Sequence, residues 1–195
     1  QLTYMWTGWL LGKDEARRFS PDYLLRPKRA NDWAFILETM TNNLRAIAGT
    51  LAADAGVVIC CSLTTLTYLN VLALAAAAAG LQIENIAYQP GSADSLKRPP
   101  AFGGLAGYCY IRCGRARGAA VVAAGDVSDS AQRTALAAAT QLLRERGEPA
   151  AYIWVYLAML ERLSQAGDLA RLAAAPAGDV PPWELLRQIE TGGLM

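Results

Sequence analysis

A helical hydrophobic stripe followed by an uninterrupted apolar run is the clearest pattern in the chain, and it occupies residues 42–61. Apolar side chains recur at helical spacing from Leu44 to Leu51, and residues 54–56 supply a turn. Residues 57–61 are then apolar at every position. Such a run is typical of a strand that is covered on both faces.

A second helix and a second strand are predicted directly afterwards. The pattern becomes helical after Ser62, an expected N-cap, and continues to Gly80, where a C-terminal cap is expected. Residues 81–88 alternate loosely between apolar and polar positions, and Pro90 ends the segment. The order helix, strand, helix, strand predicts an α/β fold.

The remaining patterns are one strand and several helices. Apolar spacing predicts a short helix near residues 2–10 and a long helix after an N-cap at Asn31 or Asp32. Residues 107–113 alternate as a strand with two different faces, and the apolar residues 119–124 indicate either one more short strand or a buried linker. The C-terminal part is helical, in the segments 130–146, 150–166, 168–174 and one after Pro181-Pro182. We therefore divide the chain into an α/β part, residues 1–125, and a helical extension, residues 126–195.

Composition excludes several classes of function. Histidine is absent, which removes Ser-His catalysis, Cys-His catalysis and imidazole ligation of metals. The 18 Lys and Arg residues against 17 Asp and Glu residues give a net charge of +1, so any binding of nucleic acid must be local. Hydrophobic residues make up 53% of the 195 residues, enough for a substantial core.

The four cysteines are expected to be reduced core thiols of a cytoplasmic protein. Cys60 and Cys61 lie in the first predicted strand, and Cys109 and Cys113 share one face of a later one. Neither pair has the spacing of a zinc ribbon, so no metal site is expected.

No apolar stretch is long enough to span a bilayer, so no membrane partner is expected. The chain begins at Gln1 within aromatic sequence, and we expect it to come from inside a longer polypeptide.

Two segments carry the local positive charge. Residues 13–29 place six cations around Phe19 and Tyr23, and the loop after Pro90 carries two more. A solvated loop is one interpretation, and a surface that contacts phosphates and stacked bases is the other. The DNA-contact candidates are Lys13, Arg26, Lys28, Arg29, Lys97 and Arg98.

The common motifs of nucleotide-binding and hydrolytic enzymes are missing. The sequence contains no GxGxxG, no GxxxxGK[ST], no GxSxG and no HExxH. Asp126 and Asp129 are interpreted as residues at a helix start.

Four segments together resemble the second half of bacterial DNA amino-methyltransferases. They are LTYMWTGWLLGKDEA, NDWAFILETMTNNLRAIAGTLAADAGVVICC, AAAAAGLQIENIAYQP and GGLAGYCYIRC, within residues 1–113. In that family an Asp-Pro-Pro-Tyr tetrapeptide precedes a segment ending like WxxWLG, a helix of type DWxxxLxxxLxxIxxxLxxxG leads into the fifth strand, and AGF or AGL opens the sixth.

The resemblance implies a partial Rossmann-like methyltransferase sheet, strands five to seven, with flanking helices. It implies methyl transfer from S-adenosylmethionine to an exocyclic amine of adenine or cytosine in DNA. The tetrapeptide and the Gly-rich cofactor motif would precede Gln1, so cofactor binding and catalysis require an N-terminal half, in the same polypeptide or as a partner chain. Tyr4 and Trp6 become candidates for lining the pocket that receives a flipped base.

Two other interpretations remain open. One is a non-catalytic methyltransferase-like module for DNA or protein contact, and the other is an unrelated α/β domain with the same order of elements. An open three-stranded sheet also leaves an edge where a fourth strand should pair, and we expect another segment, or the chain's own C-terminal helices, to cover that edge.

Overall fold

The structure is a computed structural model that describes residues 32–63, 65–90, 107–116, 127–148, 151–175 and 180–192. Its contacts divide the chain into two units, Gln1–Phe35 and Ile36–Met195. The elements discussed below belong to the second unit, apart from the first residues of helix α3 (Trp33–Thr50).

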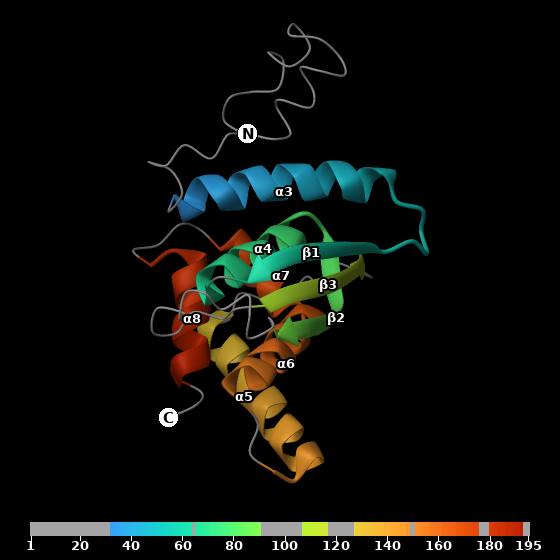
Figure 1. Cartoon of the computed structure of the whole chain (residues 1–195). Helices are drawn as coiled ribbons and strands as arrows, with labels where there is room; N and C mark the ends of the chain where they lie inside the picture. The colour runs from blue at the N-terminus through green and yellow to red at the C-terminus, as the bar shows by residue number, and fades with distance from the viewer. Residues whose placement is uncertain are drawn as a thin grey trace, which may run out of the picture. The chain divides into compact units, whose positions relative to one another are not determined.

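Among the described residues the sheet has three strands, and the middle one is the last of the three in sequence. Strands β1 (Val57–Leu63) and β2 (Leu81–Pro90) both pair antiparallel with β3 (Gly107–Arg115), in the order β1-β3-β2 (Figure 1). Because β1 and β2 both run opposite to β3, they are parallel to each other. Helix α4 (Leu66–Ala78) connects them, as parallel strands require a crossover. The mixed α/β character that the sequence predicts is therefore confirmed.

Local chemistry explains where helices α3 and α4 begin. The Asp32 carboxylate accepts a hydrogen bond from the Phe35 backbone N–H at 3.1 Å, so Asp32 is the expected N-cap of α3. For α4 the expected N-cap was wrong. Ser62 pairs with Tyr108 inside β1, and the Thr65 hydroxyl accepts from the Tyr68 N–H at 3.2 Å instead. Pairing with β3 prolongs the strand past Ser62 and moves the cap.

The end of α4 agrees with the sequence. Gly80 has φ of +79°, a conformation that glycine adopts without steric cost, and it follows the last helical turn directly. The Gly80 N–H donates to the Ala77 carbonyl at 3.0 Å. The chain then enters β2 at Leu81.

Helix α4 is the centre of the core. Its residues from Leu69 to Ala76 are all buried, as expected of a helix that is apolar on every side. It contacts β1 and β2, and also α7 (Asp168–Ala174) and α8 (Pro182–Gly192). The core therefore joins the sheet to the C-terminal helices.

The C-terminal sequence is helical, as predicted, and it docks on the sheet. Helices α5 (Val127–Arg146) and α6 (Tyr152–Gln165) pack against each other, and α6 contacts β2. The Tyr88 and Trp154 rings meet edge to face with centroids 5.8 Å apart. The described part of the chain contains no helix with the length and hydropathy needed to cross a membrane.

Arginine side chains fix helix α3 next to these elements. Arg115, at the end of β3, donates to the carbonyls of Ala48 at 2.9 Å and Leu51 at 2.6 Å. These carbonyls lie at the C-terminal end of α3, where cations are favourable. Arg45 of α3 donates in turn to the Ala78 carbonyl of α4 at 3.3 Å.

Candidate functional site

The two faces of the sheet differ sharply in exposure. The face that meets the helices carries buried side chains, among them Cys61, Cys109, Ile111 and Cys113. On the opposite face, each described residue that pairs across the strands is exposed. We call this face the open face. It comprises Val58, Cys60, Ser62, Asn85, Ala87, Gln89, Tyr108, Tyr110 and Arg112.

The prediction that β1 is covered on both faces is wrong for this chain. Val58 is 56% exposed and Cys60 is exposed, whereas Cys61 is only 7% exposed. The reason is that the described helices that contact the sheet bury only one of its faces. Cys60 is consequently not a core thiol, although Cys61, Cys109 and Cys113 are.

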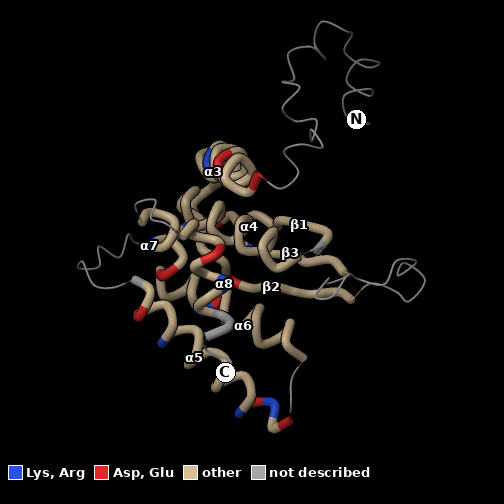
Figure 2. Tube along the Cα trace, turned by 90° about the vertical axis from the view of Figure 1, so that its left-hand side faces the viewer, with Lys and Arg blue, Asp and Glu red and all other residues tan. Residues whose placement is uncertain are grey.

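The open face mixes apolar and polar side chains, and the one charged residue among those named, Arg112, is paired. The Arg112 Nε lies 3.0 Å from a carboxylate oxygen of Glu84, which stands at a register shift in β2. The Tyr110 hydroxyl donates to the Gln89 side-chain oxygen at 3.1 Å. Charged residues are absent from β1, whose tube is tan along its length in Figure 2. The face therefore offers aromatic and aliphatic area with no net charge.

The two outer edges of the sheet also differ. On β2, the Ile83 N–H donates to the Ser164 hydroxyl at 2.7 Å, and the Ile86 N–H donates to the Glu161 carboxylate at 2.5 Å. Both acceptors belong to α6, so this edge is closed by the chain's own C-terminal helix. The expected covering of an edge concerned the opposite side of the sheet, beside β1, where a fourth strand should pair, so these contacts do not test it. Within the described residues, by contrast, β1 pairs with β3 only.

The cysteines separate into one accessible thiol and three protected ones. Burial raises the pKa of Cys109 and of Cys113 to about 12, with smaller contributions from Cys61 and Glu84 respectively. Burial also raises the pKa of Cys61, partly offset by the backbone N–H of Cys109. These three thiols are therefore protonated and unreactive near neutral pH. The described residues contain no group of three or more Cys, Asp or Glu side chains that could hold a metal ion.

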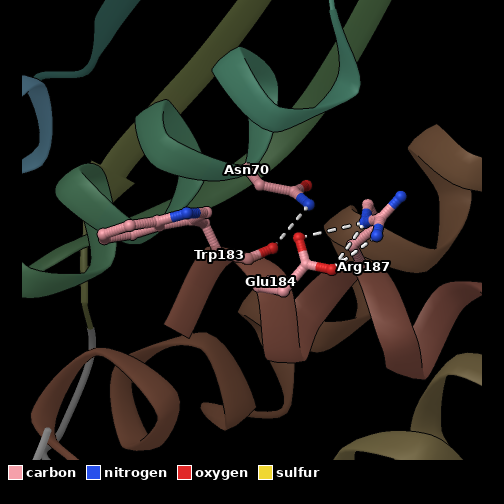
Figure 3. Close-up of polar contacts among 4 residues, drawn as sticks. All are labelled: Asn70, Trp183, Glu184 and Arg187. Carbon is pink, nitrogen blue, oxygen red and sulfur yellow. Dashed lines mark hydrogen bonds and ion pairs between the residues drawn. The ribbon is translucent and has the colours of Figure 1, made fainter. Parts of the chain in front are cut away.

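Buried polar groups hold the helices together. The Tyr156 hydroxyl donates to the side-chain oxygen of Asn70. The Asn70 amide donates in turn to the Trp183 carbonyl at 3.3 Å, as Figure 3 shows. Asn70 and Tyr156 are both fully buried. Figure 3 also shows the Glu184–Arg187 ion pair within α8, which is local to that helix. The hydrogen bonds among Tyr156, Asn70 and Trp183 link α6, α4 and α8. Because these buried polar groups are hydrogen-bonded to one another, we assign them a structural role.

A shallow groove of about 570 Å³ runs along α5. Each of its described lining residues belongs to that one helix, so the groove is a feature of the helix surface. The lining residues are Arg133, Leu136, Ala137, Thr140, Gln141, Arg144 and Glu145.

The candidate site residues named from the sequence lie outside the part of the chain that the structure describes. They are Tyr4, Trp6, Lys13, Arg26, Lys28, Arg29, Lys97 and Arg98. The open face was not identified from the sequence. The alternation of Tyr108, Tyr110 and Arg112 with the cysteines was a usable signal, but it does not say which face the helices cover.

Comparison of the chain with protein-family models, with curated proteins and with solved structures found no match.

Proposed function

We propose that this chain is the C-terminal portion of an S-adenosylmethionine-dependent DNA methyltransferase that modifies an exocyclic amine of adenine or cytosine. The observation that carries the proposal is the order and direction of the strands around α4. A parallel pair, β1 and β2, joined by a crossover helix is the unit from which Rossmann-like sheets are built.

The reversed strand supports the same assignment. The resemblance implies that this chain holds three strands of the methyltransferase sheet, the fifth to the seventh, and three strands are described. Here β3 follows β1 and β2 in sequence, runs antiparallel to both and separates them. A β-α-β unit followed by an inserted reversed strand is a more specific feature than α/β composition alone.

In this proposal the described residues form the scaffold, and the residues that bind the cofactor, the base and the DNA lie in other segments. S-adenosylmethionine is bound mainly by an N-terminal half, which supplies the Gly-rich loop and the tetrapeptide. The pocket candidates Tyr4 and Trp6 and the basic segments contact the flipped base and the DNA backbone. The partner is therefore DNA, together with the N-terminal half or an equivalent partner chain.

The test begins with the polypeptide encoded directly upstream of residue 1. We expect it to contain a strand that ends in Asp-Pro-Pro-Tyr or a close variant. Coexpressed with this chain, it should transfer labelled methyl groups from S-adenosylmethionine to unmethylated DNA, and nucleoside analysis should place them on an exocyclic amine. The matched control replaces the Asp of the tetrapeptide by Ala.

Two outcomes would contradict the proposal. An upstream sequence without such a tetrapeptide would remove its catalytic half, and an assembly that binds DNA without methyl transfer would favour a non-catalytic module. The isolated chain should show no binding of S-adenosylmethionine by titration calorimetry. Micromolar affinity there would contradict the placement of the cofactor site.

A further inference from the structure

Two of the buried thiols face each other across the sheet. Cys61 of β1 lies directly opposite Cys109 of β3 in the antiparallel register. Both side chains belong to the face that meets the helices, where Cys61 is 7% exposed and Cys109 is fully buried. Directly opposite residues of an antiparallel pair have Cα atoms about 4.5–5.5 Å apart, which lies within the range of about 4.4–6.8 Å that a disulfide bridges. The register therefore places these two thiols within reach of one covalent bond.

The other two cysteines lack such a partner position. Cys113 is fully buried on the same face of β3, but it lies opposite Val57. Four residues along a strand span about 13–14 Å, well beyond the ~7 Å between Cα atoms that a disulfide tolerates, so Cys113 cannot reach Cys61. Cys60 is exposed on the open face. All four cysteines lie in described strands, and the register aligns one pair of them.

The aligned pair lies near one end of the β1–β3 ladder. Two further pairs follow it, and the last of these joins Leu63 to Gly107. Strand ends open at a lower free energy than the centre of a sheet. In the closed sheet, burial raises the pKa of Cys109 to about 12 and also raises the pKa of Cys61, so thiolates form mainly when this end opens. The two thiols are therefore protected at rest and become reactive through a local opening.

We propose that Cys61 and Cys109 form a reversible disulfide that fastens β1 to β3 when the protein meets a small-molecule disulfide such as oxidised glutathione. The Cys61 thiolate attacks one sulfur of the oxidant, forms a mixed disulfide and releases one small thiol. The Cys109 thiolate then attacks the Cys61 sulfur, forms the cross-strand bond and releases the second small thiol. Two protein thiols are oxidised, one small disulfide is reduced to two thiols, and the two protons pass to the released thiols. This inference does not depend on the proposed function.

The bond changes how firmly β1 is held. Among the described residues β1 pairs with β3 only, so a link between these two strands anchors β1 in the sheet. The link also closes the loop from residue 61 to residue 109, which restricts the unfolded chain. The midpoint of thermal unfolding should therefore rise by about 5 °C or more on oxidation, and dithiothreitol should reverse the change. The stability of β1 then follows the redox state of its surroundings, as in the transient disulfides of reducing compartments.

Tryptic peptides identify the pairing. The test uses Cys60→Ser, which removes the exposed thiol and its competing reaction with the oxidant. The folded variant is treated with oxidised glutathione at pH 8, blocked with N-ethylmaleimide in urea and digested without reduction. Cleavage after Arg112 separates Cys109, in peptide 98–112, from Cys113, in peptide 113–115, and Cys61 lies in peptide 46–97. Peptide 46–97 should be linked to peptide 98–112 in about tenfold or greater excess over peptide 113–115, because Cys113 is out of reach.

Two further variants, made in the Cys60→Ser chain, form a matched pair. Cys109→Ala and Cys113→Ala each remove one fully buried thiol from β3, and circular dichroism checks that both are folded. Cys113→Ala should keep the linked product and the higher unfolding temperature, whereas Cys109→Ala should lose both. The peptide map of Cys60→Ser decides the pairing even if Cys109→Ala does not fold.

Three outcomes would overturn the proposal. The first is an equal yield of the two linkages in the folded protein, which would mean that the register does not select the pair. The second is a linkage to peptide 98–112 that forms in urea only, which would mean that the folded sheet never opens to the oxidant. The third is a linked product with an unchanged unfolding temperature, because the bond would then not fasten β1.

Discussion

At the scale of single residues, Glu161 shows how a carboxylate is used to close a sheet edge. Burial raises its pKa above the ordinary value of 4.5, and the hydrogen bond from the Ile86 N–H lowers it by a smaller amount. Because the pKa is raised in the folded state, the associated stability is complete below pH 4.5 and is lost as the pH rises through the folded pKa. The ionised carboxylate is therefore a costly acceptor at neutral pH.

Substitution of Glu161 separates its charge from its hydrogen bond. Glu161→Gln keeps an oxygen for the Ile86 N–H without the charge, so it should match or exceed the stability of the unmodified chain at pH 7 and flatten the acid-side pH dependence. Glu161→Ala leaves that N–H without its acceptor and should cost about 1–2 kcal/mol. Urea unfolding at pH 4.5 and 7 measures both. Equal losses for Gln and Ala would show that the hydrogen bond contributes nothing.

Asp168 is a fully buried carboxylate at the start of α7. It lies 2.7 Å from the Arg171 guanidinium and accepts from the Ser130 hydroxyl at 3.3 Å. Asp168→Ala should destabilise the fold by about 2–3 kcal/mol, because it leaves the largely buried Arg171 without its counter-charge. Thermal or urea unfolding measures the loss.

Two controls test whether the Asp168 effect comes from the ion pair. Asp129→Ala removes an exposed carboxylate from the first turn of α5 and should cost about 0.5 kcal/mol or less. Asp168→Leu combined with Arg171→Met should recover much of the lost stability, since an apolar pair can replace a buried ion pair. A double variant as unstable as Asp168→Ala would contradict this account.

At the scale of elements, periodicity predicted which segments are helices and strands but not how they are covered. The spacing of Leu44 and Leu51, and the alternation around Cys109, identified α3 and β3 because each reflects one covered face. The N-cap of α4 was misplaced because pairing with β3, a non-local contact, decides that β1 continues through Ser62. Glu161 is a charged residue within an otherwise apolar helical segment. Its position could have indicated that α6 supplies a hydrogen-bond acceptor to the edge of β2.

Cys109 and Cys113 are the two fully buried thiols of β3, and their ionisation should make the stability of the fold decrease at high pH. The pKa of Cys109 and of Cys113 is about 12 in the folded chain, against an ordinary value of 9.0. Below pH 9 both thiols are protonated in the folded and unfolded states, so stability is unaffected. Between pH 9 and 12 only the unfolded chain loses these protons, and the free energy of unfolding should fall by up to ~1.4 kcal/mol per pH unit for each thiol.

Urea unfolding at pH 8, 9 and 10 tests this dependence. Cys113→Ala should be less stable than the unmodified chain at pH 8 because it opens a small cavity, but its loss of stability above pH 9 should be shallower. The difference between the two proteins removes the contribution of Tyr and Lys residues, which titrate in both. Identical slopes would show that Cys113 ionises as readily in the fold as in the unfolded chain.

At the scale of the whole molecule, the sequence predicted α/β character and a helical C-terminal part, and both are present among the described residues, but it did not predict that one face of the sheet is exposed. The apolar run 57–61 predicts a strand with two covered faces, whereas Val58 and Cys60 are exposed among the described residues. A run of apolar residues indicates that a segment is a strand, but it does not say which described elements cover it. The candidate DNA contacts depend on segments outside the described residues, so their prediction rests on charge patterning.

Binding of duplex DNA by the assembled protein should depend on the basic segment at residues 13–29. Reversing the charges of Arg26, Lys28 and Arg29 to Glu should weaken binding for all sequences and reduce the slope of log affinity against log salt by about one per lost phosphate contact. Fluorescence anisotropy at several salt concentrations measures both quantities. Reversal of Arg133 and Arg144 on α5 is the control, since it changes the net charge without touching that segment. An unchanged slope in the first variant would show that residues 13–29 are solvated surface without a role in DNA binding.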